Sequence, residues 1–217
     1  MLGGQHIEIA FMSAIGNWLN GSGWVEVFEH GSRFTLARVE SFLYGNKVKR
    51  CRYAHKVFLV IFLQLLQEAY LEECPEKLIS CDEWLLQKCE TSVNAFHWVK
   101  VISLQTTLFM FVRSLLEANF EMYISSLTAI IPWMFALDNV HYEQWLSIYI
   151  WDLAMLKEKD SALYQNFIAG HFTVKKRNHK FSYIATEQAH EQNNNLVKIG
   201  GGAIGILDSQ AALLNGQ

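Results

Sequence analysis

Proline is scarce in this sequence, with only two among 217 residues, and the 13 glycines are an ordinary number. Because proline interrupts helices and marks turns, its scarcity favours long helices over many short strands. Hydrophobic residues make up 51% of the chain and aromatic residues 13%, which is enough to bury a substantial core. The composition therefore argues against disordered and fibrous classes and predicts a mainly helical protein.

Paired cysteine motifs are also absent. The four cysteines are Cys51, Cys74, Cys81 and Cys89, at irregular spacings and with no C-x-x-C pair. This pattern argues against zinc and redox sites and predicts reduced thiols in an intracellular protein. The first residues lack a basic segment followed by an apolar block, so no secretory signal is expected. The longest apolar run, 57–66, has about half the ~20 residues that span a bilayer, so we expect no membrane partner.

Signatures of common enzyme classes are missing as well, since there is no G-x-S-x-G and no P-loop. The run Gly200-Gly-Gly-Ala-Ile-Gly205 has the spacing G-x-G-x-x-G, but it lacks the following phosphate-binding helix signature and is a weak signal by itself. The net charge is −3, with 13 Lys+Arg against 18 Asp+Glu up to Gly170 and 5 against 3 after it. A free-standing nucleic-acid binder normally has a stronger positive field, because phosphate contacts dominate affinity. Any DNA contact is therefore expected to be local.

Apolar residues recur at helical spacing along most of the chain. Helices are predicted at 5–19, 24–30, 36–44, 50–73, 82–89, 94–117, 119–137 and 141–157, with Pro132 and Asp138-Asn139 as interruptions. After Gly170 the runs 171–174 and 181–184 alternate like strands, followed by a helix at 185–197 and a short apolar stretch at 203–207. We therefore predict a mainly α fold: a helical body at 5–169, and a β-hairpin plus helix within 170–217.

Two groups of basic residues are candidates for nucleic-acid contact. The predicted hairpin tip carries Lys175, Lys176, Arg177 and Lys180. The predicted helix 50–73 begins with basic residues, near Lys49 and Arg50, and ends with acidic residues. This distribution is opposite to the one that the helix dipole favours, which is acids at the N-terminus and bases at the C-terminus. Both groups could contact phosphates without sequence preference, and the alternative for the helix is a solvated end.

The densest polar cluster is predicted on the late helix, where Glu187, His190, Glu191 and Asn194 share one face. A carboxylate there could bind a divalent metal. The zinc motif H-E-x-x-H is not completed, because Asn194 stands at the second histidine position. The di-iron motif E-x-x-H occurs once, whereas such sites need two. The alternative is a plain solvated face.

Several short segments of the sequence resemble those of a family of uncharacterised transposon-derived proteins of invertebrate genomes. That family is similar to the C-terminal part of DDE-type, RNase H-like transposases. The segments are Gly3-Gly-Gln-His6-Ile-Glu-Ile-Ala10, Gly21-Ser-Gly-Trp24, Ser41-Phe-Leu43, Phe135-Ala-Leu-Asp138, Gly170-His-Phe-Thr-Val174, Phe181-Ser-Tyr-Ile-Ala185 and Gln188-Ala-His-Glu-Gln-Asn-Asn194. They are spread over most of the chain.

The resemblance implies a helical insertion at 5–169 within an RNase H-like fold, with His6 following a missing second aspartate. Glu191 would be the final metal-binding acid, with His190 and Glu187 as neighbours. A full-length relative would use Mg²⁺ or Mn²⁺ held by three carboxylates for DNA strand transfer. The chain departs from the family pattern at Glu187, where Asp is expected, at Ile199-Gly200 and at Gln210.

Because the first two aspartates are missing, we expect no cofactor and no catalysis from this chain by itself. The partners implied are DNA, through phosphate contacts, and a second copy of the chain, in the nucleus. The alternative is a non-enzymatic helical interaction module.

Overall fold

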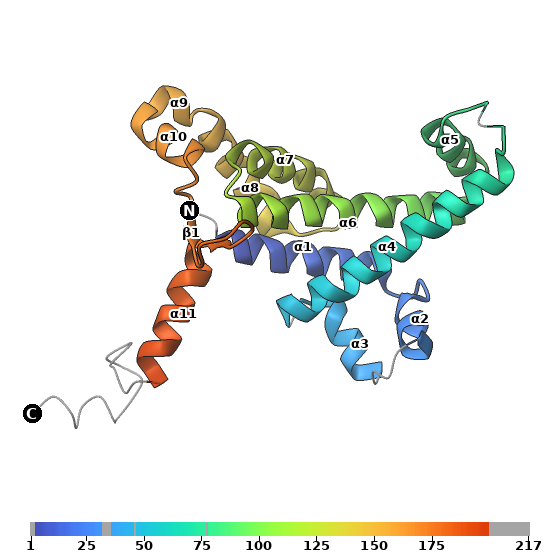
Figure 1. The fold of residues 1–217 in the computed structure, drawn as a ribbon, viewed down its shortest axis with the longest axis horizontal. Helices are drawn as coiled ribbons and strands as arrows, with labels where there is room; N and C mark the ends of the chain where they lie inside the picture. The colour runs from blue at the N-terminus through green and yellow to red at the C-terminus, as the bar shows by residue number, and fades with distance from the viewer. Residues whose placement is uncertain (1–2, 32–35, 46, 77, 200–217) are drawn as a thin grey trace, which may run out of the picture.

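The computed structural model describes residues 3–31, 36–45, 47–76 and 78–199 (Figure 1). Its helices are α1 (Gly4–Leu19), α2 (Trp24–Gly31), α3 (Leu36–Leu43), α4 (Val48–Glu73), α5 (Cys81–Thr91), α6 (Val93–Glu117), α7 (Phe120–Ala136), α8 (Val140–Ala154), α9 (Leu156–Lys159), α10 (Ser161–Ile168) and α11 (Thr186–Ile199). Two short strands, β1 (Thr173–Lys175) and β2 (Tyr183–Ala185), precede α11. The mainly helical class with a late hairpin and helix is confirmed.

Helix α1 lies at the centre of the molecule and contacts α3, α6, α7 and α11 (Figure 1). Its inner face is fully buried at Ile7, Phe11 and Ile15. Opposite it, Leu104 and Leu108 of α6 are also fully buried. Burial of such side chains is worth about 1.5–3 kcal/mol each, so the contact between α1 and α6 forms the middle of the core.

The contact between α1 and α3 is unusually close at Gly16. A Cβ placed on this residue would lie 2.1 Å from the carbonyl oxygen of Leu43. No side chain fits at that distance, so only glycine lets the two backbones meet here.

Pro132 does not interrupt the helix as predicted, because α7 continues through it. The missing N–H leaves the carbonyl of Thr128 without its helical partner. Both residues are exposed, so this carbonyl faces solvent and the cost is small. The predicted break at Asp138 is confirmed, since this residue has a positive φ of 52° and separates α7 from α8.

The hairpin strands begin two residues later than predicted. They are antiparallel, with Thr173 opposite Ala185 and Lys175 opposite Tyr183. Strand β2 packs on α6, while α11 packs on α1, which attaches the end of the described chain to the helical body. The predicted apolar stretch 203–207 lies outside the described residues.

Candidate functional site

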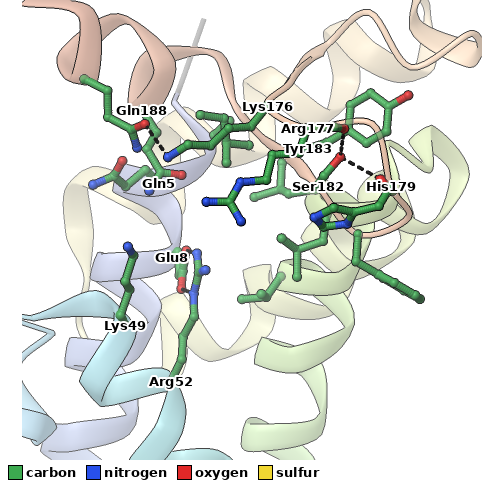
Figure 2. A pocket seen from close by; sticks show the side chains of 17 residues that line it. Gln5, Glu8, Lys49, Arg52, Lys176, Arg177, His179, Ser182, Tyr183 and Gln188 are labelled. Atoms are coloured by element: carbon green, nitrogen blue, oxygen red, sulfur yellow. Dashed lines mark hydrogen bonds and ion pairs between the residues drawn. The ribbon is translucent and has the colours of Figure 1, made fainter. Parts of the chain in front are cut away.

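A pocket of about 240 Å³ opens between the hairpin, the start of α1, the start of α4 and the end of α6 (Figure 2). Its polar lining residues are Gln5, Glu8, Lys49, Arg52, Lys176, Arg177, His179, Ser182, Tyr183, Gln188 and Gln192. Val112, Leu115 and Leu116 of α6 provide an apolar wall. The pocket therefore joins segments from both ends of the chain.

Glu8 lies at the floor of the pocket with no exposed surface. The Arg52 guanidinium donates to both carboxylate oxygens, from Nε to Oε1 and from Nη2 to Oε2. A buried carboxylate requires such a partner, and the two-pronged arrangement is the strongest one available. The pair ties α1 to α4 and neutralises the charge of Arg52.

Three further cations line the pocket, at Lys49, Lys176 and Arg177. Figure 2 shows the Arg177 guanidinium and the Lys49 ammonium directed into the space beside the Glu8–Arg52 pair. Lys176 donates from Nζ to Gln192 Oε1 at 2.9 Å. None of the three forms an ion pair with a residue that the structure describes. With Glu8 cancelling Arg52, the lining carries a net charge of about +3, which favours an anion.

The loop between β1 and β2 is held in shape by Ser182, which is almost fully buried. Its hydroxyl lies within hydrogen-bonding distance of the carbonyl of Arg177, at 2.5 Å, and of His179, at 2.7 Å. Lys176 donates its backbone N–H to the carbonyl of Ser182 at 2.9 Å. These bonds hold in place the backbone that carries Lys176 and Arg177 over the pocket.

The structure therefore brings together three of the six predicted basic residues and separates the others. Lys175 donates to Asn178 Oδ1 at 3.2 Å and lies over the Tyr183 ring, outside the pocket lining. Lys180 is exposed and does not line the pocket. Arg50 lines a separate apolar groove beside α4.

Glu187, predicted beside a metal ligand, caps a helix in this structure. Its Oε1 accepts the backbone N–H of Gln5, near the N-terminus of α1. The α1 cap residue, Gly3, has no side chain to do this, and a negative charge is favourable at that end of a helix. Glu187 also raises the pKa of Tyr149, to a smaller extent than the burial of that phenol does.

The other residues predicted for this site lie at the surface. His190 and Glu191 are exposed, and His6 is exposed with its carbonyl accepting the Tyr142 hydroxyl at 3.4 Å. Within the described part of the chain, no three His, Cys, Asp or Glu side chains lie close enough to hold a metal ion. The described residues therefore do not fit Mg²⁺ or Mn²⁺.

Sequence reasoning missed Glu8 and His179 as pocket residues. A signal for Glu8 was present, because it shares a helical face with Phe11, Met12 and Ile15, which are all buried. An acid on an otherwise apolar face must find a buried cation. His179 carried no comparable signal.

These features define a helical protein with a basic pocket built partly by its hairpin. Residues 64–213 match the family described as Domain of unknown function (DUF8702), and the chain belongs to this family. The match covers the hairpin side of the pocket, whereas Gln5, Glu8, Lys49 and Arg52 lie outside it. No curated protein and no solved structure matches the chain.

Proposed function

We propose that this chain is a non-enzymatic helical module that binds the phosphate backbone of DNA through the basic pocket, without sequence preference. The observation that supports this is the convergence of Lys49 from α4 with Lys176 and Arg177 from the hairpin. Arginine and lysine at phosphate contacts supply affinity that is independent of base sequence.

The charge arrangement favours phosphate over other ligands. The carboxylate in the lining, Glu8, is occupied by Arg52, so it does not repel an incoming anion as a free acid would. The Arg177 guanidinium offers a fork of donors that suits two phosphate oxygens, and the lysines act as point charges around it. Amide side chains of Gln5, Gln188 and Gln192 add donors at the rim.

The test compares two double variants with the same change of charge in the same hairpin. Lys176→Glu/Arg177→Glu alters the pocket, whereas Lys175→Glu/Lys180→Glu alters positions outside its lining. Binding to a fluorescent duplex is measured by anisotropy at several salt concentrations. Each phosphate contact contributes about 0.9 to the slope of log affinity against log salt, so the pocket variant should lose about 1.8 from the slope.

The matched control should lose much less. Equal losses in the two variants would show that overall charge, not the pocket, attracts DNA. Unchanged binding in the pocket variant would refute the assignment. Thermal melts of both variants establish that the fold is retained.

A second proposal concerns descent: that the chain corresponds to the C-terminal part of a DDE-type, RNase H-like transposase. The observation that favours it is that Gly3 and Gly4 lie against Glu187 and Ala185, at the junction of β2 and α11. In the longer parent that the resemblance implies, a strand leading into Gly3 would arrive beside the helix that carries Glu191. This arrangement would bring the strand that carries the second aspartate close to Glu191, the final metal-binding acid of the resemblance.

The metal-binding consequence of that proposal can be tested on this chain. Because Glu191 lacks neighbouring ligands among the described residues, Mn²⁺ should bind no better than to any exposed glutamate. Calorimetric titration of the wild type and Glu191→Gln should give the same weak, non-stoichiometric heats. A tight one-to-one site lost in Glu191→Gln would contradict the proposal that the chain is only a part of the metal site.

A further inference from the structure

Helix α4 carries charges of the wrong sign for its own dipole. Its first turn contains Lys49 and Arg50, and its last turn contains Glu72 and Glu73. Glu73 is paired with Lys88 of α5 at 2.5 Å, but neither Arg50 nor Glu72 has an ion-pair partner among the described residues. Basic side chains at the positive N-terminal end of a helix dipole, and acidic side chains at its negative end, are unfavourable. Both ends of α4 would therefore be stabilised by nearby charges of the opposite sign.

The same helix exposes an apolar face. Ile61 is 49% exposed, Leu65 53% and Tyr53 69%. This face forms one wall of a groove of about 900 Å³, whose other wall includes Val27 of α2. Figure 1 shows the second half of α4 leading away from α1 toward α5. The exposed fractions of Ile61 and Leu65 show that this face is accessible. An apolar surface of this length is typical of a docking site.

We propose that this face binds a second copy of the chain, with the two α4 helices antiparallel. An antiparallel partner places its acidic end against the basic end of α4, and the reverse at the other end. The dipoles of the two α4 helices are then also antiparallel, which is favourable. The Leu65–Glu72 part of each copy would enter the groove beside α2 and α3 of the other.

The spacing of the charges fits a two-fold axis at Ile61. Arg50 lies eleven residues before Ile61 and Glu72 lies eleven after it. A two-fold axis at Ile61 therefore sets Arg50 of each copy against Glu72 of the other. It also sets Val57 against Leu65, both of which line the groove. Symmetry of this kind is the commonest arrangement in soluble dimers.

A membrane is the competing occupant, because α4 and α6 are each long and apolar enough by length and composition to span a bilayer. However, Gln64, Gln67 and Glu68 interrupt the exposed side of α4. Polar and charged groups facing hydrocarbon are costly, whereas in the antiparallel dimer Glu68 lies one helical turn from Glu72 and therefore near the basic end of the partner's α4. A second copy therefore suits this face better than lipid.

The first experiment measures association of the full chain by sedimentation velocity over a range of concentrations. The wild type should form dimers. Ile61→Asp should raise the dimer dissociation constant about tenfold or more, because it introduces charge at the axis twice. Ile168→Asp is the matched control: this isoleucine is 41% exposed and belongs to α10, a helix that lies far from α4 (Figure 1). A monomeric wild type, or equal effects of both variants, would overturn the proposal.

The second experiment tests the antiparallel arrangement by exchanging charges. Arg50→Glu and Glu72→Arg should each weaken the dimer, and the double variant Arg50→Glu/Glu72→Arg should restore it. The two residues are about 33 Å apart along one helix at ~1.5 Å per residue, so they cannot pair within one copy. A dimer that is not restored by the exchange would overturn the antiparallel contact.

The membrane alternative is tested with the same protein by flotation with vesicles of phosphatidylcholine and phosphatidylserine. The wild type should stay in solution as a dimer. Monomers that float with the vesicles, and lose this in Ile61→Asp, would assign the face to lipid and overturn the proposal.

Discussion

Neutralising Glu8 should change stability and DNA affinity in opposite directions. In Glu8→Gln the amide oxygen can still accept one hydrogen bond from Arg52. The amide nitrogen, which is itself a donor, then faces the second N–H of Arg52 and cannot accept it. Breaking a buried ion pair costs about 3–5 kcal/mol. The cost here should be nearer 2–3 kcal/mol, because the Arg52 side chain is 25% exposed and water can replace part of what is lost.

The affinity should rise because Arg52 is no longer neutralised. One more free cation in the pocket adds about 0.9 to the salt slope, which corresponds to a threefold to tenfold gain in affinity near 0.1 M salt. Stability is measured by chemical denaturation and binding by anisotropy. For a chain of this length, 2–3 kcal/mol lowers the melting temperature by roughly 5–10 °C.

The double variant Glu8→Gln/Arg52→Gln is the control. It removes both charges, so its salt slope should return to that of the wild type. If Glu8→Gln instead binds DNA more weakly than the wild type, Glu8 does not restrain Arg52, and the pocket does not bind through its net charge.

Two further predictions concern the core. Burial lowers the pKa of His55 to about 4, and its Nδ1 accepts from Gln105 Nε2 at 3.1 Å. Because the unfolded chain takes up this proton near pH 6.5 and the folded one near 4, stability should fall as pH drops through this range, by about 2 kcal/mol at pH 5. His55→Gln should reduce this difference in the free energy of unfolding between pH 7.5 and pH 5, measured by chemical denaturation. Gly16→Ala should cost about 2–3 kcal/mol because it separates α1 from α3, and a melting temperature within a degree or two of that of Gly31→Ala, which meets nothing within 4 Å, would refute this.

Most helices could be predicted because apolar residues recur with helical period and Gly or Asn residues mark the ends. Helix α10 was missed although its signals are local: Asp160 caps it by accepting from Leu163 N–H at 2.9 Å, and Gly170 follows it with a φ of 91°. The pocket was only half predictable. Each basic group could be identified from the sequence alone. No local pattern shows that Lys49 and Lys176 line the same pocket, because that depends on how the hairpin packs on α1 and α6.

The central position of α1 has a consequence for biosynthesis. Its partner α6 ends roughly 100 residues later, which is about 5–20 s at usual rates of translation. During that interval the apolar face of α1, including Phe11 and Ile15, has left the ribosome without its main partner. A chaperone that holds apolar helices would therefore find α1 uncovered during this interval. The family-matched region 64–213 lacks α1 altogether, so production of that region alone should leave Leu104 and Leu108 uncovered and favour aggregation.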